Sequence, residues 1–351
     1  MPESLQTERL VVINPLERLD WDLLMAEHPE SCFFHGTAWA QVLQQTYGHR
    51  PLYLCRFSEG RLRGLLPMME VSGLLTGRRG VSLPFSDFCP ILGTTEQDRK
   101  ELFNLALEQG RTKRWRYFEC RSGNKERPDA NQSVAFFSHR INLSQGTESL
   151  FKGFDESTRR GIRKAEKSGL QIEFSSGIES VQIFYSLHCQ TRRRHGLPPQ
   201  PFRFFENIAK YVLNKGQGFV ATVLQNREPV AAAVFLHNAR QVIYKFGASN
   251  FASQRLRANN FLMGKTIEHC VKKGFQELHL GRTSLTNDGL RRFKSGFGAH
   301  EEKIEYYKYN FAQEAFVSDV DRAESWINGV FRCLPMPLLR LGGRLLYPNL
   351  S

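Results

Sequence analysis

Residues 287–309 (NDGLRRFKSGFGAHEEKIEYYKY) constrain the fold more than any other stretch of this sequence. Phe293 and Phe297 are four residues apart and therefore share one face of a helix. The segment before the two glycines carries three cations, and isolated charges are costly to bury: Arg291, Arg292 and Lys294. The pattern predicts a short helix that is anchored by two phenyl rings and holds a cation at its packed end. A basic surface turn is the alternative.

Two glycines and an aromatic strand follow this helix. Gly296 and Gly298 permit a close approach of the backbone or a positive φ. The run YYKY (306–309) indicates a strand, and FQELHLG (275–281) indicates another strand before the helix. The whole region is therefore expected to fold as strand, helix, glycine turn and strand.

The length of 351 residues exceeds one typical hydrophobic core, which favours two domains. No apolar run reaches the length of about 18 residues that a membrane-spanning helix needs. The N-terminus lacks a basic region followed by an apolar stretch, so we expect a cytoplasmic protein. Seven scattered cysteines without a CxxC pair indicate reduced thiols, and no residues are spaced as metal ligands.

The net charge of +13 is the strongest compositional signal. A basic surface attracts polyanions such as nucleic acid, phosphorylated substrates or anionic lipid. Charge alone does not select among these partners.

Periodicity and turn signals predict alternating helices and strands. Helices are expected over 37–47, 97–110, 147–169, 177–194, 202–214 and 255–273. Strands are expected over 51–57, 62–71, 115–119, 135–141, 170–174, 218–225, 229–237, 240–247 and 275–280. A helix, a strand, a tight turn and a strand occur at 37–71 and again at 202–237, which suggests a duplicated plan.

Four motifs in this order resemble the Fem family and the wider group of bacterial acyltransferases related to it. They are FFHGTAWAQVLQQTYGHRPLYL (33–54), GRRGVSLPFSDFCPILG (77–93), RRGIRKAEKSGLQIEF (159–174) and FKSGFGA (293–299). Together they cover roughly residues 30 to 310. Fem proteins are non-ribosomal peptidyltransferases that add amino acids to peptidoglycan precursors, and they are built on the acetyltransferase (GNAT) fold.

The resemblance implies an α/β (α+β) fold of two tandem GNAT-like units, each a mixed sheet flanked by helices. The expected division is an N-terminal unit over 1–145, a C-terminal unit with the acyl-transfer site over 146–315, and a tail over 316–351. The tail is basic, amphipathic and interrupted by prolines. It either docks on the body of the protein or lies on a membrane surface.

The resemblance also implies an acyltransferase that moves an aminoacyl or acyl group to an amine or hydroxyl of a cell-envelope or exopolysaccharide precursor. The donor would be acyl-CoA or aminoacyl-tRNA, with no tightly bound cofactor. The acceptor would be a small-molecule or lipid-linked precursor, reached by peripheral contact with an anionic inner membrane, and DNA is not expected as a partner. The sequence has no two-helix heptad insertion, which points toward the shorter Fem-like proteins and away from tRNA.

Two other functions stay open. One is CoA-dependent N-acetylation of a small metabolite or sugar nucleotide. The other is a non-catalytic protein that binds RNA or another polyanion. Both are compatible with the basic composition.

Lys294 is the predicted catalytic residue. The resemblance assigns the Lys of the FKxxFG segment to stabilising the negatively charged intermediate of acyl transfer. Gly296, Phe297 and Gly298 would shape the site around it, and Arg291 would contact substrate. The alternative is a surface Lys paired with a carboxylate, either Glu301 or Glu302.

Two basic clusters are candidates for binding phosphate. Arg163 and Lys164 belong to an unbalanced row of cations on a helix, which is either a solvated face or a polyanion site. The second cluster opens the helix expected at 255, where acetyltransferases bind the pyrophosphate of CoA; it comprises Arg255, Arg257, Asn259 and Asn260. This segment, QRLRANN, lacks the usual glycines, and its asparagines are otherwise capping residues.

Neither a nucleophile nor a general base stands out. The sequence has no GxSxG elbow, and Cys189 and Cys270 lie inside expected helices, so a covalent thiol mechanism is disfavoured. Four titratable residues could act as the base: Asp87, His237, His279 and Asp288. Asp87 is also a candidate for binding substrate. The base would otherwise come from the substrate.

Overall fold

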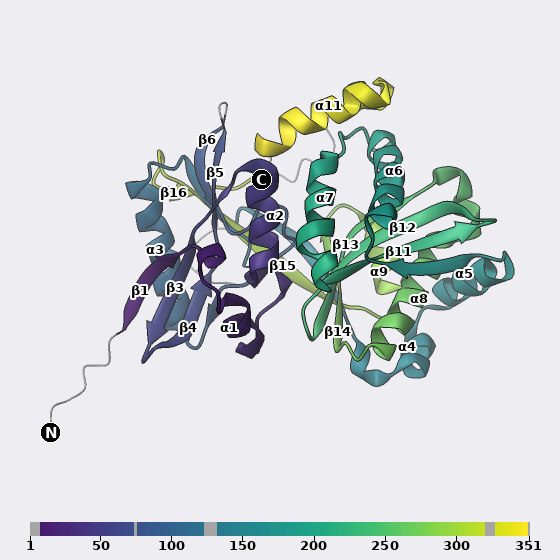
Figure 1. Cartoon of the computed structure of the whole chain (residues 1–351), viewed down its shortest axis with the longest axis horizontal. Coiled ribbons are helices and arrows are strands. Elements are labelled where there is room, and N and C mark those ends of the chain that lie inside the picture. The colour runs from purple at the N-terminus through teal and green to yellow at the C-terminus, as the bar shows by residue number, and fades with distance from the viewer. Residues whose placement is uncertain (1–7, 74–75, 123–131, 320–326, 350–351) are drawn as a thin grey trace. The chain divides into compact units, whose positions relative to one another are not determined.

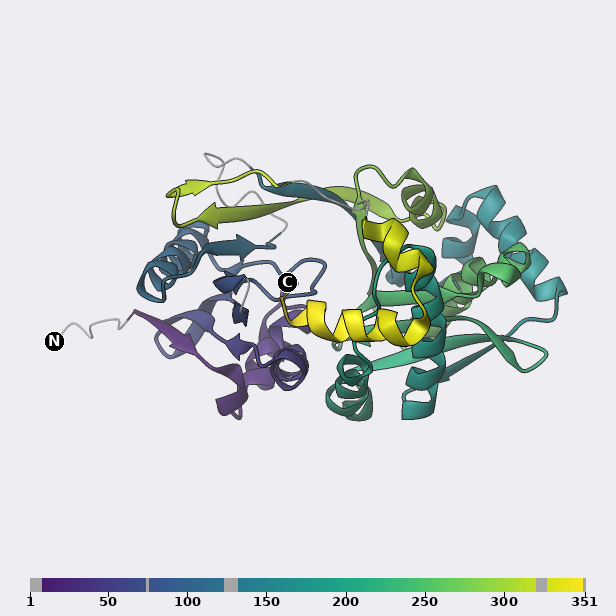
Figure 2. The same ribbon diagram turned by 90° about the horizontal axis from the view of Figure 1, so that it is seen from above.

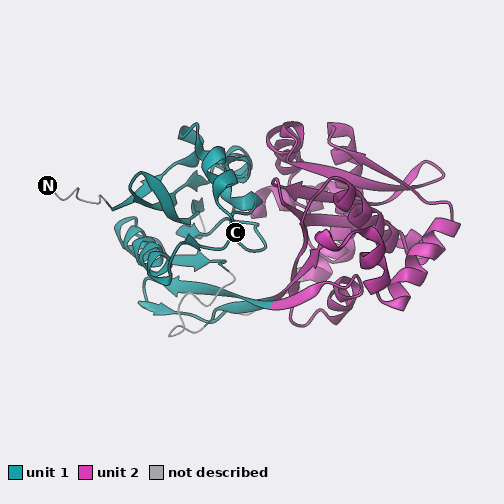
Figure 3. Cartoon of the chain, turned by 90° about the horizontal axis from the view of Figure 1, so that it is seen from below, with its two compact units in different colours: residues 1–136, 303–321, 348–351 teal, residues 137–302, 322–347 magenta. Residues whose placement is uncertain are grey.

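The computed structural model describes residues 8–73, 76–122, 132–319 and 327–349 of the chain. The chain forms two compact units (Figure 3). Unit 1 comprises residues 1–136, 303–321 and 348–351, and unit 2 comprises residues 137–302 and 322–347. These limits differ from the expected division after residues 145 and 315, because β9 (Val134–Asn142) and β15 (His300–Asn310) each contribute residues to both units.

Unit 1 has two small sheets and three described α-helices. The helices are α1 (Trp21–Glu27), α2 (Thr37–Tyr47) and α3 (Glu96–Thr112), with 3-10 turns at Pro15–Glu17 and Phe33–His35. One sheet has the order β1-β3-β4-β7, with β1 (Arg9–Ile13), β3 (Tyr53–Ser58), β4 (Arg61–Leu66) and β7 (Leu92–Gly93). The other has the order β15-β8-β6-β5-β2, with β8 (Tyr117–Cys120), β6 (Gly77–Val81), β5 (Met69–Gly73) and β2 (Arg50–Pro51). The short strand β16 (Ala315–Phe316) pairs with β15.

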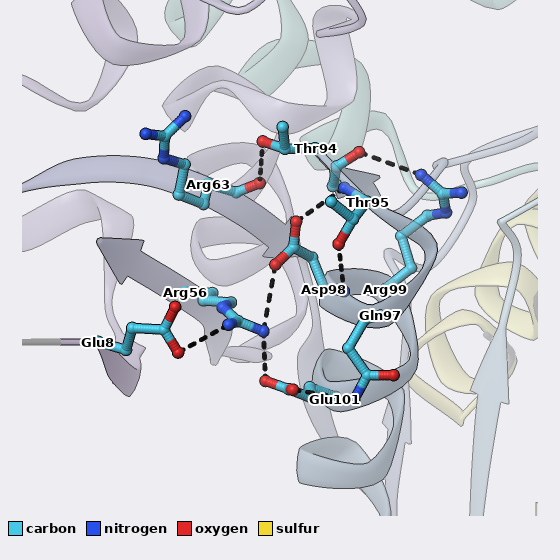
Figure 4. Close-up of polar contacts among 10 residues, drawn as sticks. Glu8, Arg56, Arg63, Thr94, Thr95, Gln97, Asp98, Arg99 and Glu101 are labelled. Carbon is cyan, nitrogen blue, oxygen red and sulfur yellow. Dashed lines mark hydrogen bonds and ion pairs between the residues drawn. The ribbon is translucent and has the colours of Figure 1, made fainter. Parts of the chain in front are cut away.

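An ion-pair network ties α3 to β3 in unit 1 (Figure 4). The Arg56 guanidinium lies 3.1 Å from Asp98 and also pairs with Glu101 and Glu8. Asp98 closes a capping box with Thr95, whose hydroxyl accepts from the Asp98 amide at 3.1 Å. The cap satisfies amides of the first turn, so it fixes where α3 begins.

Unit 2 contains a mixed sheet with the order β10-β11-β12-β13-β14-β9-β15. Its further strands are β10 (Gln171–Ser175), β11 (Gly218–Gln225), β12 (Glu228–His237), β13 (Gln241–Ser249) and β14 (Glu277–Ser284). Its described helices are α4 (Thr147–Gly153), α5 (Glu156–Lys167), α6 (Ile178–Arg194), α7 (Phe202–Tyr211), α8 (Ala258–Lys272), α9 (Asp288–Ser295), α10 (Ile327–Cys333) and α11 (Met336–Leu346). Additional 3-10 turns lie at Leu143–Gln145, Leu213–Lys215, Phe251–Leu256 and Tyr347–Asn349.

Alternation along the strands explains why helices cover both faces of this sheet. Successive side chains of a strand point to opposite faces. Phe219 and Phe235 belong to a core cluster with α8 and α5 residues such as Leu262 and Ile162. On the other face, Phe246 of β13 packs against Phe205 of α7, with ring centroids 5.4 Å apart. Both faces are therefore buried, as the apolar runs of β11 and β12 indicate.

Most expected elements of unit 2 are confirmed, and one expected helix is wrong. The strands of the β11–β13 meander and the tight turn between β11 and β12 are as expected, with positive φ at Asn226 and Arg227. The helix expected over 147–169 is broken into α4 and α5. The break leaves Phe154 extended and buried against Phe297, and it lets the Asp155 amide donate to the Gly296 carbonyl at 2.9 Å.

Two further expectations needed correction. The strand expected over 62–71 is interrupted between β4 and β5, because Pro67 has no N–H to donate to a ladder. The helix expected from residue 255 begins at Ala258 instead, since Phe251–Leu256 forms a 3-10 turn and Arg257 adopts a left-handed conformation with φ 58°.

The two helices of the tail dock on the rest of unit 2. Helices α10 and α11 pack on α6 (Figures 1 and 2). Arg192 of α6 donates to the Tyr347 hydroxyl at 2.8 Å. The backbone of Gly343 comes so close to Pro199 that an added Cβ would lie 1.9 Å from its carbonyl oxygen. A side chain at position 343 would push α11 off the body.

Candidate functional site

Helix α8 connects two neighbouring parallel strands, β13 and β14. The pairing described between β13 and β14 covers only Gln241–Ile243 and Glu277–His279. β13 continues to Ser249 and leads through the 3-10 turn into α8, which returns the chain to β14. The Asn250 side chain holds that turn by accepting from the Ala252 amide at 3.0 Å. The end of β13 is therefore held next to the start of α8.

The first turn of α8 presents backbone amides that favour an anion. Arg257 occupies the N-cap position, and its side chain has no acceptor atom that could cap the helix. Unsatisfied amides and the helix dipole give a helix N-terminus partial positive charge. Phosphate groups bind at such ends in many proteins.

Two adjoining pockets open at this helix end. Their volumes are about 290 Å³ and about 430 Å³. The two pockets share four lining residues, so they form one depression, which we name the α8 groove. The shared residues are Arg257, Asn260, Gly289 and Phe293. The first pocket adds Ser249, Asn250, Ser253 and Gln254 from the end of β13 and the following turn, and Asn259 from the first turn of α8. The second adds residues of α5 and α9: Ser157, Thr158, Arg160, Gly161, Lys164 and Arg292.

The lining of the α8 groove is cationic and rich in hydrogen-bond donors. Its four cations come from three different elements: Arg160 and Lys164 from α5, Arg257 from the cap of α8, and Arg292 from α9. Among the described residues that line the two pockets there is no Asp or Glu. Hydroxyl and amide side chains fill the remaining positions. A ligand with several phosphate oxygens fits this chemistry.

Two glycines set the width of the groove by letting helices approach closely. A Cβ at Gly161 would lie 3.2 Å from the Asn260 side chain, so α5 and α8 nearly touch there. A Cβ at Gly296 would lie 2.5 Å from the Thr158 hydroxyl, which draws the end of α9 against α5. These contacts bring the cations of three elements to one depression.

The structure brings together part of the predicted phosphate-binding set. Arg257, Asn259 and Lys164 line the α8 groove. Arg255 and Arg163 are exposed and are not part of the lining of these two pockets. On a helix, adjacent residues point about 100° apart, which separates Arg163 from Lys164.

Arg292 and Phe293 line the groove but were not among the predicted binding residues, whereas Asn260 belonged to the cluster expected at the start of this helix. Arg292 stands next to the predicted Arg291 and could not be distinguished from it by residue type. Its position one step around α9 is the signal that places it in the α8 groove.

Lys294 is buried, with 3% of its surface exposed. Its ammonium donates to the carbonyl oxygens of Gly281 at 2.7 Å and Arg282 at 3.0 Å, both in β14. The alternative of a surface lysine is therefore wrong. The cation lies at the packed end of a short helix, as expected, and its role in acyl transfer stays a prediction.

Arg291 takes part in an ion pair on the side of α9 that faces β15. Its guanidinium makes two hydrogen bonds to Glu301, at 2.8 and 2.7 Å, and lies 4.1 Å from the centre of the Phe137 ring. His139 contacts the same carboxylate through Nε2 at 3.0 Å. Burial lowers the pKa of His139, and the nearby Lys294 charge lowers it further, against the opposing effect of Glu301. Substrate binding by Arg291 stays a prediction.

Phe297 and Gly298 complete the turn after α9. The Phe297 ring is buried and contacts Phe293 and Phe154, with centroids 5.3 and 5.2 Å away. Gly298 has φ +67°, a conformation that glycine adopts without strain. Phe297 anchors the end of α9 in the core, and the role of both residues in shaping the site stays a prediction.

Asp87 belongs to unit 1, whereas the α8 groove belongs to unit 2. Its carbonyl oxygen accepts a hydrogen bond from the Tyr306 hydroxyl. Leu83 and Phe85, in the same SLPF segment, have positive φ of 52° and 61°. Such conformations are strained for residues with side chains. The role of Asp87 as base or substrate contact stays a prediction.

The other three candidate bases differ in their surroundings. The Gly281 amide donates to Nδ1 of His279 at 2.9 Å, so Nε2 carries the proton and donates to the Ser138 hydroxyl at 2.9 Å. Burial lowers the pKa of His237. Asp288 is exposed, and the cap of α9 is the preceding Asn287, which accepts from the Leu290 amide at 3.0 Å.

The two helical cysteines are poor nucleophiles. Both Cys189 and Cys270 are buried. Burial raises the pKa of Cys270 to about 12 and raises that of Cys189 as well. A thiolate, the reactive form of cysteine, is therefore scarce at either position near neutral pH.

Two features are absent from the described part of the chain. In the described ranges no three His, Cys, Asp or Glu side chains are grouped as a metal site would require. Within the same ranges, no helix combines the length and the apolar character needed to cross a bilayer.

Residues 152–303 match the family described as acetyltransferase (GNAT) domain. This range contains every residue that lines the α8 groove. The segment that matches this family makes up most of unit 2, and the groove lies within that segment.

Solved structures extend the likeness to both units. The structure of FemX superposes with a TM-score of 0.66 at 15% identity, covering 87% of this chain and 98% of FemX. A tandem GNAT protein from the clavulanic acid biosynthesis pathway gives 0.55 at 11% identity, covering 87% and 98% of the two chains. The L-PGS from Bacillus licheniformis gives 0.53 at 13% identity, with 93% and 96% covered. A search of curated protein sequences found no match.

The chain therefore has the Fem-like, tandem GNAT fold that its motifs lead one to expect. At these identities the likeness concerns the fold.

Proposed function

We propose that unit 2 transfers an acyl or aminoacyl group from a phosphate-bearing donor, held in the α8 groove, to an amine or hydroxyl of a cell-envelope or exopolysaccharide precursor. One observation carries this proposal: four cations and the first turn of α8 converge on the groove inside the GNAT domain. A donor such as acyl-CoA or aminoacyl-tRNA combines phosphates with an activated carbonyl. The groove has the chemistry to hold the phosphates.

Two phosphate-bearing molecules are candidates for the donor, acyl-CoA and aminoacyl-tRNA. The GNAT domain match favours acyl-CoA. The fold of FemX and the likeness to an Agrobacterium fabrum protein assigned as a lysylphosphatidylglycerol synthetase (TM-score 0.56, 17% identity) favour an aminoacyl donor. Arg159, Arg163 and Lys167 extend the cationic face of α5 beyond the residues that line the groove, which suits a larger polyanion.

In the proposed reaction the acceptor nitrogen or oxygen attacks the donor carbonyl carbon directly. The carbonyl π electrons move to oxygen and return when the tetrahedral intermediate collapses. Collapse expels either the CoA thiolate or the tRNA oxygen, and the tRNA oxygen takes up a proton as it leaves. The acceptor proton passes to a base, supplied by the protein or by solvent. The high pKa values of Cys189 and Cys270 support direct transfer without a thioester on either residue.

Lys294 is proposed to stabilise the charge that develops on the carbonyl oxygen. Its ammonium is already fixed by two carbonyl groups of β14, so it would not need to reorganise during the reaction. A fixed charge in a site that excludes water stabilises a transition state more strongly than a solvated one.

The donor is tested by thermal unfolding of the full chain with CoA and, separately, with tRNA. A ligand that binds only the folded protein adds RT ln(1+[L]/Kd), about 2.7 kcal/mol at a hundredfold excess over Kd. We expect one of the two ligands to raise Tm in a saturable manner. If tRNA is the donor, its affinity falls steeply with salt.

Arg257→Ala tests whether the groove is the binding site, and Arg255→Ala is the matched control. Both residues lie at the start of α8, but only Arg257 lines the groove. Equal ligand affinity in the two variants would contradict the proposed site. Binding of RNA without any acyl transfer would favour the non-catalytic alternative.

A further inference from the structure

Helix α11 has one face buried against unit 2. Leu339, Gly343 and Tyr347 follow one another at intervals of four residues, and all three are buried. Residues at this spacing share one side of a helix. The docked face is therefore fixed, and the opposite side of α11 is left to the surroundings.

That opposite side is a row of leucines. Leu338, Leu341 and Leu345 are 51%, 51% and 65% exposed. Their spacing of three and four residues places them together, about half a turn away from Leu339 and Gly343. Val330 of α10 is also 52% exposed. We name Leu338, Leu341 and Leu345 the leucine row.

Arginines flank the leucine row on one side. Arg340 and Arg344 line a pocket of about 510 Å³ with Tyr185 and Phe202, next to Leu341. The Arg340 guanidinium lies 5.4 Å from the centre of the Tyr185 ring. The stretch 327–351 contains no Asp or Glu. The helix thus presents an apolar row bordered by cations.

The composition of this surface favours lipid over protein. Between Gly329 and Leu346 the polar side chains are three arginines and one cysteine, with no Ser, Thr, Asn, Gln, Asp or Glu. A protein interface carries about one hydrogen bond per 100–200 Å², which calls for acceptors as well as donors. Arginine side chains only donate. Lipid phosphates only accept, and they stand directly above an apolar layer.

We propose that α11 docks the protein on an anionic phospholipid bilayer. The leucine row enters the boundary between headgroups and acyl chains, and Arg340 and Arg344 contact lipid phosphates. Amphipathic helices bind membranes in this orientation, parallel to the surface. Because α11 is already folded on α6, docking requires no ordering of the helix.

The docking surface does not depend on the proposed catalytic function. It would bring the enzyme to lipid-linked acceptors if that function holds, and it would still exist if the groove bound another ligand. The two proposals can therefore fail separately.

The test is co-sedimentation of the full chain with vesicles of phosphatidylcholine, with and without phosphatidylglycerol. We expect binding to the anionic vesicles and little to the neutral ones. Arg344→Ala should weaken binding about fivefold, which corresponds to about 1 kcal/mol for one cation at an anionic surface. Arg344→Lys should restore most of the affinity, because charge is what acts on the lipid.

Leu345→Asp tests the apolar contact, and Leu23→Asp in α1 is its matched control. Leu23 is 70% exposed and lies in unit 1. Leu345→Asp should reduce vesicle binding at least tenfold, whereas Leu23→Asp should bind like wild type. Circular dichroism and Tm confirm that both variants fold, and Leu338→Asp provides a second substitution in the row.

Several outcomes would overturn the proposal. These are equal binding to neutral and anionic vesicles, no vesicle binding by wild type, or unchanged binding by the folded Leu345→Asp and Leu338→Asp variants. Concentration-dependent self-association that Leu345→Asp abolishes, without vesicle binding, would assign the row to a second copy of the chain. Arg257→Ala should leave vesicle binding unchanged, which separates this result from a failure of the donor groove.

Discussion

The cations on the two sides of α9 differ in what surrounds them. Arg292 lines the α8 groove, whereas Lys294, two positions along, is buried and donates to two carbonyls of β14. Arg291, on the β15 side, is engaged by Glu301. The groove side of α9 therefore offers charge to a ligand, and the enclosed side uses charge within the fold.

This difference shows what a count of positive charges leaves out. A cation is available to bind a ligand when its donors face open space, and it contributes to the fold when backbone or carboxylate oxygens accept from it. The role proposed for Lys294 combines a contact within the fold with a charge that acts on the transition state. Substitutions on the groove side should change affinity and leave stability alone. Substitutions on the enclosed side should change stability, and Lys294 should change both.

The largest effect is expected from Lys294→Met. If Lys294 stabilises the oxyanion, kcat should fall about 10²–10³-fold, as for the loss of one such donor. The variant should also lose on the order of 1–3 kcal/mol of unfolding free energy, because two carbonyl groups lose a buried donor. Acyl-transfer rates and denaturant unfolding measure the two effects.

Lys303→Met is the control for Lys294→Met. Lys303 is half-exposed and pairs with Glu305 at the surface, where such pairs contribute little. It should keep wild-type activity and stability. A folded Lys294→Met variant with normal turnover would remove Lys294 from the chemistry and leave it a structural role alone.

A somewhat smaller effect is expected on the groove side. Arg257→Ala and Arg292→Ala should each weaken donor binding about tenfold or more, since a hydrogen bond to a charged group contributes about 1.5–3 kcal/mol. Unfolding free energies should stay within about 0.5 kcal/mol of wild type. Calorimetric titration and urea unfolding test both statements, with Arg255→Ala as control. A large loss of unfolding free energy in Arg292→Ala would show that the groove side of α9 also stabilises the fold, which contradicts the proposed difference between the two sides.

Gly296→Ala tests the contact that joins α9 to α5. The new methyl group would lie 2.5 Å from the Thr158 hydroxyl, so the two helices must separate. Forced overpacking of this kind costs about 1–3 kcal/mol. Gly153→Ala is the control, because a Cβ there meets nothing within 4 Å among the described atoms, and it should be neutral or slightly stabilising. Equal unfolding free energies for the two variants would show that α9 is free to shift.

Local patterns were sufficient to predict most elements of unit 2. The meander of β11 to β13 follows from alternating apolar residues and the turn at Asn226-Arg227. The break between α4 and α5 was missed because it depends on a distant partner, the Gly296 carbonyl that accepts from Asp155. Helical periodicity within one segment contains no information about such a contact.

The candidate site was only partly predictable for the same reason. Arg257 and Lys164 were found because each belongs to a basic cluster that fits a helix end or a helix face. Arg292 and Arg291 are adjacent and of one type, so only the geometry of α9 separates the groove residue from the one paired with Glu301. Burial of Lys294 depends on the carbonyls of β14, which no sequence pattern reveals.

The smallest expected effect concerns pH and the enclosed side of α9. His139 is buried, its Nδ1 has no hydrogen-bond partner among the described residues, and its pKa is lowered by burial and then by the Lys294 charge. The unfolded chain has the ordinary histidine pKa of about 6.5, so below that pH it binds a proton that the native protein resists. The unfolded state then holds more protons, and the stabilising contribution, fully present above a pH of about 6.5, is lost as pH falls.

His139→Gln should therefore flatten the dependence of unfolding free energy on pH between about 5 and 6.5. Urea unfolding at several pH values measures the slope, and the other buried histidines cancel because both proteins contain them. Removing the neighbouring charge by Lys294→Met should raise the pKa of His139, and so the His139→Gln substitution should change the slope less in that background than in the wild type. If the slope difference persists unchanged in Lys294→Met, the two groups do not interact, and the enclosed side of α9 does not act as one electrostatic unit.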